Sequence, residues 1–418
     1  MISGDTIAAI ATAPGRGGVA VVRVSGSEAF GIAERLTGDK EQSAGIRVGR
    51  IANVDEGIVL FFRAPHSYTG EDVVEFQCHG GTVTPRRVLE ACLAAGTRLA
   101  RRGEFTERAF LNGKLDYGQA ESVLDLVDAK TARAADAALE GLAGRRRREC
   151  RALYEQALDL STRLEHALDI DEGELPPDFL ANVRASLTTL NSSLRAAIAK
   201  AAEGRLLRSG ALVVLAGPPN AGKSSLMNAL LDENRAIVSD VPGTTRDSIE
   251  EWLDLDGWPI RLTDTAGLHE TDDGIEREGV RRAKELLSKA DLVLWLGSPS
   301  SVFRLPSSVL RLHPKSDLGR GEGLNVSAKT GEGLEELKRA IVAKLEEKVA
   351  VSDDGDALEG DIAAYHEALA ALDSVGDADL VLTANAVRNV AERLGAALGA
   401  TYSADMLDKL FSRFCVGK

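Results

Sequence analysis

A phosphate-binding pattern in the middle of the chain limits what this sequence can fold into. Residues 217–224 fit G-x-x-x-x-G-K-S, an apolar run at 211–216 precedes them, and a helix-like stretch follows from Leu226 to Leu231. In this strand–loop–helix context the glycines let backbone N–H groups turn inward around a β-phosphate, and the helix N-terminus adds positive charge. We expect Lys223 to reach the β- and γ-phosphates and Ser224 to bind Mg²⁺. The other predicted nucleotide contacts of the loop are Asn220, Gly222 and Ser225.

Two further nucleotide motifs follow at plausible distances, so a glycine-rich turn without a ligand is the weaker interpretation. Polar and apolar residues alternate over 250–262 around Asp256-Gly257, which predicts a β-hairpin that leads into Asp264-Thr-Ala-Gly267. The aspartate is expected to hold Mg²⁺, and the glycine can approach the γ-phosphate. Upstream, Thr245 in the stretch Gly243–Asp247 would complete the Mg²⁺ shell and form a switch that loss of the γ-phosphate releases. Alone, the same stretch could be a polar turn.

The predicted base-recognition residues lie in Lys315-Ser-Asp317 and Ser327-Ala-Lys329. These resemble the guanine motifs N-K-x-D and S-A-K of GTPases related to translation factors. Asp317 can accept hydrogen bonds from guanine N1 and N2, and the Lys315 stem can cover the base. Pro314 stands where the first motif has asparagine, and proline has no side-chain amide. We therefore expect weakened nucleotide affinity with the guanine preference retained.

The residue that orients the attacking water in Ras-like enzymes is a glutamine, and this chain has Leu268 in its place. A leucine cannot orient water. Glu276, on the following acidic segment, could do so directly or through another water, although its spacing alone favours a surface carboxylate. Residues 297–308 alone separate the apolar run that ends at Leu296 from the strand expected at Val309–Leu312. The crossover helix expected there would be shortened or absent.

Composition narrows the class further. The 418 residues carry a formal net charge of −14, which makes the chain a poor non-specific binder of nucleic acid. The basic run Arg145–Arg148 lies in a helical pattern, which favours a solvated face over an RNA contact. The cysteines fit no zinc or small disulfide pattern, and no apolar stretch approaches the roughly 20 residues of a membrane span. We expect a cytoplasmic protein without a membrane partner.

The organisation along the chain predicts a multidomain α/β and α protein. β-like runs at 20–24 and 58–62 and a helix-like stretch at 84–95 indicate a small α+β domain, and helical periodicity dominates on both sides of the nucleotide motifs. The predicted domains are an N-terminal α+β domain at 1–116, a helical domain at 117–208 and 346–418, and an inserted Ras-like P-loop α/β domain at 209–345.

The whole chain resembles the MnmE (TrmE) family, the GTPases of wobble-uridine modification in tRNA. The resemblance rests on the GTPase motifs and on blocks outside them, which are Pro14–Gly18, Tyr68–Asp72, Glu75–Gly81, Gly103–Asp116 and Cys415–Lys418. The N-terminal blocks and the Cys-Val-Gly-Lys end are specific to the family, whereas the phosphate loop alone is not.

The resemblance implies an N-terminal domain that binds folate and forms a homodimer. It also implies a heterotetramer-like complex with the FAD protein MnmG that adds aminomethyl or carboxymethylaminomethyl groups to tRNA. A formyl- or methylene-tetrahydrofolate would supply the one-carbon unit. The positions that match the folate contacts of the family are Arg23, Glu75, Lys114 and Lys418. Taken by themselves, these residue types are ordinarily solvated surface.

The resemblance also implies a K⁺ ion beside the nucleotide that takes the place of an arginine finger, with GTPase-domain dimerisation completing its site. Asn220 matches the K⁺-ligating asparagine of the family, and the other predicted K⁺ ligands are Ser239, Val241 and Thr244. Glu276 aligns with the residue that orients water in the family, which strengthens the hypothesis that it is catalytic.

Two other functions stay open at this point. One is a regulatory GTPase of ribosome assembly, which would not need the N-terminal blocks or the Cys-Val-Gly-Lys end. The other is a folate-dependent transferase with a degenerate nucleotide domain, for which Pro314 and the short crossover are the support. Cys415 could be a nucleophile, but no His or Asp partner is evident, and a small apolar packing residue is the safer interpretation.

Overall fold

The computed structural model of the protein describes residues 5–38, 45–170, 175–234, 250–264, 284–297, 308–351, 361–373, 380–399 and 404–418. The chain forms two compact units. Unit 1 comprises Met1–Leu124, Gly141–Gly144 and Thr401–Lys418, and unit 2 comprises Asp125–Glu140 and Arg145–Ala400.

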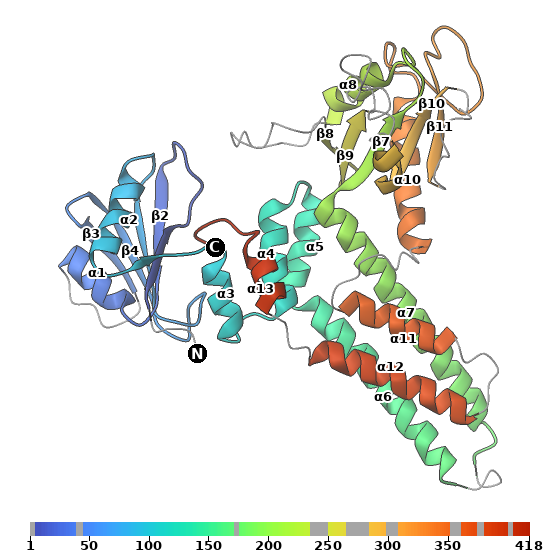
Figure 1. Cartoon of the computed structure of the whole chain (residues 1–418), viewed down its shortest axis with the longest axis horizontal. Helices are drawn as coiled ribbons and strands as arrows, with labels where there is room; N and C mark the ends of the chain where they lie inside the picture. Colours follow the sequence, from blue (N-terminus) through green and yellow to red (C-terminus); the bar gives the residue numbers. More distant parts are fainter. Residues whose placement is uncertain are drawn as a thin grey trace. The chain divides into compact units, whose positions relative to one another are not determined.

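The strands of unit 1 are β1 (Ile7–Ile10), β2 (Val19–Ser25), β3 (Gly45–Ile51), β4 (Asp55–Phe62), β5 (Val73–His79) and β6 (Arg98–Leu99). They form one six-stranded sheet in the order β3-β4-β5-β2-β1-β6 (Figure 1). Neighbouring strands pair antiparallel except β1 and β6, which are parallel. The strands predicted at 20–24 and 58–62 lie in β2 and β4, so both predictions are confirmed.

The helices that belong to or enter unit 1 are α1 (Ala29–Thr37), α2 (Thr84–Ala94), α3 (Glu104–Leu111), α4 (Tyr117–Asp128) and α13 (Ala404–Phe411). α2 confirms the helix predicted at 84–95. Successive strand residues point to opposite faces of a sheet, so Ala20, Val22 and Val24 of β2 are buried on one face, together with residues of α1 and α2. Arg23 therefore lies on the other face.

The second face of this sheet packs against α3. Ile7 and Ala9 of β1 form a small buried cluster there with Ala100 and with Phe105 of α3. Farther along the chain, apolar residues of α4 and α13 form a separate buried cluster that includes Phe411 and Phe414. α3 therefore lies between the sheet and the last helix of the chain within unit 1.

The strands of unit 2 are β7 (Ala211–Ala216), β8 (Glu250–Leu255), β9 (Trp258–Asp264), β10 (Leu292–Leu296), β11 (Val309–Pro314) and β12 (Leu324–Val326). They form a six-stranded sheet in the order β12-β11-β10-β7-β9-β8, in which only β8 is antiparallel to its neighbour. β10 and β11 pair in parallel, as expected from the sequence, and the connection between them falls mostly outside the described residues.

Strand β7 is buried throughout its length because helices cover both faces of this sheet. Val213 and Leu215 belong to the large core that includes apolar residues of α8 (Lys223–Asn234) and α10 (Leu334–Val351). Their neighbours along β7 belong to a second core on the opposite face, which includes Leu287. A strand that is buried on both sides is typical of a parallel sheet with helices on its two faces.

The β8–β9 hairpin confirms the turn predicted at Asp256-Gly257. Both residues have left-handed backbone angles, with φ of 49° at Asp256 and 84° at Gly257, which suits a two-residue hairpin turn. Helix α5 (Ala132–Leu142) lies close to this turn, because Thr131 Oγ1, just before the helix, donates a hydrogen bond to the carbonyl oxygen of Gly257 at 2.8 Å. The turn is thus held by a segment more than a hundred residues away in the chain.

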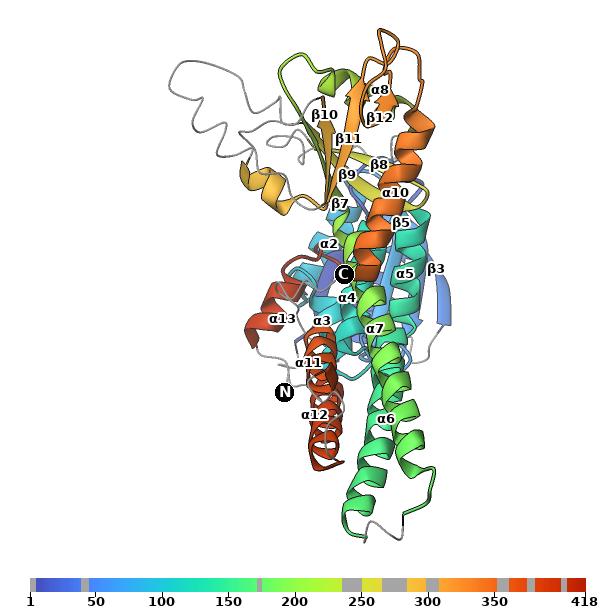
Figure 2. The ribbon, with the colours of Figure 1, turned by 90° about the vertical axis from the view of Figure 1, so that its right-hand side faces the viewer.

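The remaining helices of unit 2 are α6 (Arg145–Leu168), α7 (Phe179–Ser209), α11 (Asp361–Asp373) and α12 (Leu380–Leu398). They pack as a bundle around one apolar core (Figure 2). The periodic residues Leu153, Ala157, Leu160 and Leu164 are buried in it, as their spacing predicts.

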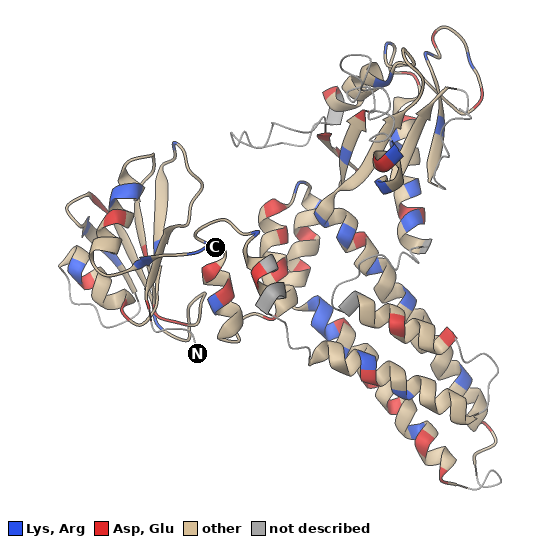
Figure 3. Ribbon diagram, in the orientation of Figure 1, with Lys and Arg blue, Asp and Glu red and all other residues tan. Residues whose placement is uncertain are grey.

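Charges of both signs occur along α6 and α7 (Figure 3). Lys200 of α7 pairs with Glu149 of α6 at 2.9 Å, and the basic run at the start of α6 includes Arg145, which pairs with Glu140 at 3.2 Å. Arg147 and Arg148 are exposed, in keeping with a solvated face. Within the described ranges, no helix combines the length and the apolar character that crossing a membrane requires.

Gly257 and Gly204 provide a matched pair of substitutions. A Cβ on Gly257 would lie 2.9 Å from Arg133 Cβ in a left-handed backbone, whereas a Cβ on Gly204, within α7, meets no atom within 4 Å. Gly257→Ala should therefore lower the unfolding free energy of unit 2 by about 1–3 kcal/mol, and Gly204→Ala should raise it by about 0.5–1 kcal/mol.

Tryptophan fluorescence during urea unfolding measures both effects, because Trp252, Trp258 and Trp295 all belong to the sheet of unit 2. Equal unfolding midpoints for the two variants would contradict this account of the turn.

Candidate functional site

The predicted phosphate loop follows β7 and leads into α8, so the expected strand–loop–helix arrangement is confirmed. Gly217 has φ of 149° and Gly222 has φ of 98°, which residues with a Cβ rarely adopt. A Cβ on Gly217 would also lie 2.5 Å from the carbonyl oxygen of Leu296. Asn220 adopts a left-handed φ of 61° and is exposed. The glycines of the pattern are thus required by the backbone itself.

Lys223, the first residue of α8, turns back over this loop. Its side chain is buried, and Nζ donates hydrogen bonds to the carbonyl oxygens of Gly217 and Pro218, each at 3.1 Å. An ammonium held by two neutral carbonyls gains a stronger, charge-assisted partner when a phosphate enters the loop. The position of Lys223 therefore suits the phosphate contact expected from the sequence.

Ser224 and Asp264 meet at the carboxyl ends of β7 and β9. Ser224 Oγ donates a hydrogen bond to Asp264 Oδ2 at 2.8 Å, and Asp264 is buried at the end of its strand. A hydroxyl and a carboxylate at this distance are oxygen ligands of the kind that Mg²⁺ prefers. Ser225 is exposed in the first turn of α8. These residues fit a magnesium site beside the phosphate loop.

The predicted base-recognition residues also lie at this edge of the sheet. Ser327 Oγ donates to Asp317 Oδ1 at 2.7 Å, which orients the carboxylate that is predicted to read guanine. Lys315 Nζ donates to the carbonyl oxygen of Asn220 at 3.0 Å, so the loop after β11 is tied to the phosphate loop. Lys329 is exposed next to this region of the chain.

Glu332 was not predicted from the sequence, and it braces the loop that is predicted to recognise the base. Glu332 Oε2 accepts a hydrogen bond from Ser316 Oγ at 3.0 Å, and Oε1 accepts one from Arg320 at 2.7 Å. The hydrogen bond from Arg320, followed by that from Ser316, lowers the pKa of this carboxyl below its usual range. No sequence signal marks Glu332, because its partners become neighbours only when the loops after β11 and β12 fold together.

Several predicted nucleotide and metal residues lie outside the described residues. They are Ser239, Val241, Thr244, Thr245, Gly267 and Glu276, together with Leu268. Their assignments stay predictions.

In unit 1 the structure brings together two predicted folate residues. Arg23 of β2 and Glu75 of β5 are opposite each other in the antiparallel register, and Arg23 Nε donates to Glu75 Oε1 at 2.8 Å. Their side chains are only 20% and 16% exposed, so this pair is largely buried, unlike most Arg and Glu side chains. The Arg23 guanidinium carbon also lies 5.4 Å from the ring centroid of Tyr68 and 5.6 Å from that of Phe105, within cation–π range.

Lys418 approaches the same place through the main chain. The backbone N–H of Phe105 donates to the carbonyl oxygen of Lys418 at 3.3 Å, and Val416 forms an antiparallel bridge with Arg102. Gly417 lies so close to β1 that a Cβ would be 2.3 Å from the carbonyl oxygen of Ile10, which explains a glycine at this position. The Cys-Val-Gly-Lys segment is therefore docked beside α3.

Lys114 and Cys415 of this region have different surroundings. Lys114 Nζ donates to the carbonyl oxygen of Pro65 at 3.0 Å and, among the described residues, forms no hydrogen bond or ion pair with Arg23 or Glu75. Cys415 is exposed, so the prediction that it is a small apolar packing residue is wrong. Its backbone, not its side chain, is held, since the carbonyl oxygen accepts a hydrogen bond from Gly103 N–H at 3.4 Å.

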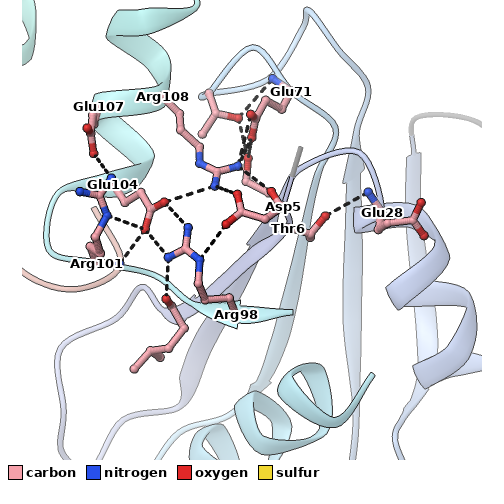
Figure 4. A network of polar contacts seen from close by, with 12 residues as sticks. Asp5, Thr6, Glu28, Glu71, Arg98, Arg101, Glu104, Glu107 and Arg108 are labelled. Atoms are coloured by element: carbon pink, nitrogen blue, oxygen red, sulfur yellow. Dashed lines mark hydrogen bonds and ion pairs between the residues drawn. The ribbon is translucent and has the colours of Figure 1, made fainter. Parts of the chain in front are cut away.

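A buried ion-pair network holds α3 in place (Figure 4). Arg108 is 1% exposed and donates hydrogen bonds to the carboxylates of Asp5 at 2.8 Å, Glu71 at 3.0 Å and Glu104 at 3.2 Å. Arg98 of β6 donates to Glu104 at 2.6 Å and to Asp5 at 2.8 Å. The network thereby joins α3 to the start of β1, to β6 and to the loop before β5.

This network should make unit 1 sensitive to acid. Burial opposes ionisation of Glu104, but hydrogen bonds from Arg98 and from the backbone of Arg101 hold its pKa at about 2, against an ordinary value of 4.5. Because the folded pKa is depressed, the stabilisation is complete above pH 4.5 and is lost as the pH falls towards 2. The shift corresponds to about 3 kcal/mol of unfolding free energy.

Glu104→Gln should therefore flatten the fall in thermal stability between pH 5 and pH 2, measured by circular dichroism. Glu107→Gln on the same helix is the control, because burial raises the pKa of Glu107 and its acid response has the opposite sign. An unchanged acid slope in Glu104→Gln would show that the network does not carry this stability.

The fold and the site of unit 2 define a class of protein. A largely parallel sheet carries a phosphate loop after β7, an aspartate that contacts the loop serine after β9, and a guanine-type motif after β11. This combination is that of a P-loop GTPase.

Comparison with known proteins identifies the family. Residues 6–114 match the family model of the GTP-binding protein TrmE N-terminus, and residues 118–415 match that of the MnmE helical domain. The tRNA modification GTPase MnmE of Symbiobacterium thermophilum is 41% identical, with 99% of each chain covered. That of Neisseria gonorrhoeae strain NCCP11945 is 42% identical, again with 99% of each chain covered. The chain belongs to the MnmE family of tRNA modification GTPases, so the predicted resemblance is confirmed.

Among solved structures, the G domain of the T. maritima FeoB iron transporter is 28% identical over 32% of this chain and 98% of that chain, with a TM-score of 0.25.

Proposed function

We propose that this protein is a K⁺-activated GTPase that works with the FAD protein MnmG in the cytoplasm. Together they would add an aminomethyl or carboxymethylaminomethyl group to the wobble uridine of certain tRNAs. Membership of the MnmE family supports the link to tRNA modification. The observation that carries the hydrolytic part is the contact of Ser224 with Asp264 beside the phosphate loop.

In this proposal each residue of the phosphate loop has a separate role. Lys223 exchanges its bonds to Gly217 and Pro218 for the β- and γ-phosphates, and Ser224 and Thr245 bind Mg²⁺. A bound Mg²⁺ neutralises the charge that develops on the phosphates. Asp264 accepts a hydrogen bond from the Ser224 hydroxyl and so orients it, and Gly267 adjoins the γ-phosphate.

Guanine selection rests on the loops after β11 and β12. Asp317 accepts the guanine N1 and N2 hydrogens, and Ser327 and Lys329 complete the pocket. The Ser327–Asp317 and Lys315–Asn220 bonds support this role, because they hold these residues in place although Pro314 lacks a side-chain amide. We retain the expectation that Pro314 weakens affinity without abolishing the guanine preference.

The role of K⁺ rests on Asn220. This residue is exposed in the loop. Its left-handed backbone sets it apart from the helix that begins at Lys223. An amide oxygen suits K⁺, with Ser239, Val241 and Thr244 as the further ligands. Glu276 then orients the attacking water, a role that Leu268 cannot perform. Dimerisation of the GTPase domains would complete the site.

The folate part of the proposal rests on unit 1. Arg23 and Glu75 offer a cation and a carboxylate side by side, and the rings of Tyr68 and Phe105 lie within reach of the guanidinium. This set of groups fits a planar heteroaromatic ring with hydrogen-bond donors and a charged tail, as in a tetrahydrofolate. Lys114 and Lys418 are the other proposed contacts, and the bound folate would supply the one-carbon unit. The homodimer is proposed to form through this domain.

GTP hydrolysis in KCl and in NaCl at equal ionic strength tests the proposal. We expect hydrolysis at least roughly tenfold faster in KCl, because the ion replaces a charge that an arginine finger contributes in other GTPases. Glu276→Ala should remove most of the K⁺-stimulated rate while leaving GDP binding intact. Equal rates in the two salts, or full stimulation in Glu276→Ala, would contradict the proposed mechanism.

Binding of 5-formyltetrahydrofolate to the same preparation distinguishes this function from that of a ribosome-assembly GTPase, which needs no folate. A chain with K⁺-stimulated turnover and no folate binding would favour that second function.

A further inference from the structure

α3 connects the buried ion-pair network to the Arg23–Glu75 site. Glu104 and Arg108 lie one helical turn apart and belong to the network (Figure 4). The two residues that follow Glu104, Phe105 and Thr106, point to the Arg23–Glu75 site. The ring of Phe105 lies within cation–π range of Arg23, and Thr106 Oγ1 is 2.8 Å from the hydroxyl of Tyr68. A shift of α3 would therefore move both aromatic contacts of Arg23.

The loop that carries Tyr68 is fixed on two sides. Towards the sheet, Ser25 Oγ lies 2.7 Å from Thr69 Oγ1 and donates to Glu71 Oε2 at 2.8 Å. Towards the helix, Glu71 accepts the bond from Arg108. Just after α3, Asn112 Nδ2 donates to the carbonyl oxygen of Thr69 at 2.8 Å. Ser25 and Arg23 lie on the same face of β2, so this loop is anchored next to the residue that it covers.

We propose that Glu71, Thr106 and Tyr68 are positioning residues of the Arg23–Glu75 site. The Glu71–Arg108 ion pair fixes the loop to α3, the Thr106 hydroxyl fixes the Tyr68 ring, and the ring holds the Arg23 guanidinium in the orientation that a folate requires. This inference rests on the folate site proposed above and adds residues that the family resemblance did not assign.

The chemistry of the Tyr68 contact supports this role. The Tyr68 phenol is protonated at neutral pH, burial raises its pKa further, and its hydroxyl forms a neutral hydrogen bond with Thr106. Thr106 itself is fully buried, and a buried hydroxyl that loses its partner is costly. A planar ring with one hydrogen-bonded end has few orientations, which limits the orientations of the guanidinium that contacts it.

The test is titration calorimetry of 5-formyltetrahydrofolate with the full chain at pH 7.5. Thr106→Val keeps the shape of a buried side chain and removes its hydroxyl, and Tyr68→Phe removes the other hydroxyl and keeps the ring. We expect each variant to raise Kd roughly three- to tenfold, and the double variant to be no weaker than the weaker single one, because both remove the same bond. Glu71→Gln should raise Kd roughly tenfold.

The control is Glu90→Gln, because Glu90 forms an exposed ion pair with Arg86 at 3.4 Å in the same unit. It should bind folate as the wild type does. Stoichiometry separates positioning from simple loss of structure, since a destabilised variant lowers the number of sites, whereas a positioning residue changes Kd at full occupancy. GTP hydrolysis by unit 2 serves as an internal check of the preparation.

Each outcome decides the question. If the wild type binds folate and the three variants bind it with unchanged Kd, this inference is overturned and the proposed function stays intact. The three variants are Thr106→Val, Tyr68→Phe and Glu71→Gln. Additive effects in the double variant overturn the Tyr68–Thr106 contact as the cause. Absence of folate binding by the wild type overturns the folate proposal itself and this inference with it. If Glu71→Gln fails to fold, the isosteric Thr106→Val variant carries the test.

Discussion

The parallel sheet of unit 2 places the ends of several strands at one edge, and the nucleotide site depends on that constraint. β7 ends at the phosphate loop, β9 at Asp264, β11 before Lys315 and β12 before Ser327. Because parallel strands finish on the same side, residues up to 95 positions apart in the chain become neighbours. Two contacts show the result, namely Ser224 with Asp264 and Lys315 with Asn220. The residues proposed for hydrolysis and for base selection therefore share one support, although Pro314 stands where the guanine motif has asparagine.

In unit 1 an antiparallel register brings residues that are distant in the chain together. Because β2 and β5 pair so that Arg23 is opposite Glu75, the two charges meet on the face of the sheet that α3 covers. Burying an arginine such as Arg108 is costly unless carboxylates surround it, and Asp5, Glu71 and Glu104 do so. The cost of that burial is offset by hydrogen bonds that fix a helix beside the Arg23–Glu75 pair.

Local patterns made part of this structure predictable. The spacing of glycines around Lys223 and the Asp256-Gly257 turn predicted the phosphate loop and the hairpin, because both depend on backbone conformations that few residues adopt. The burial of Arg23 with Glu75, and the Arg108 network, were not predictable, since they require strand register and contacts between distant segments. Cys415 was also mispredicted, because its residue type favours burial whereas the structure leaves it exposed.

Competition for the nucleotide site tests the central claim most directly, namely that these loops select guanine despite Pro314. A fluorescent GDP analogue bound in the presence of Mg²⁺ and K⁺ is displaced by GDP or by ADP. The account predicts that GDP competes at a concentration lower than that of ADP by at least roughly a hundredfold, because adenine leaves Asp317 without its hydrogen-bond donors. Equal competition by the two nucleotides would contradict it.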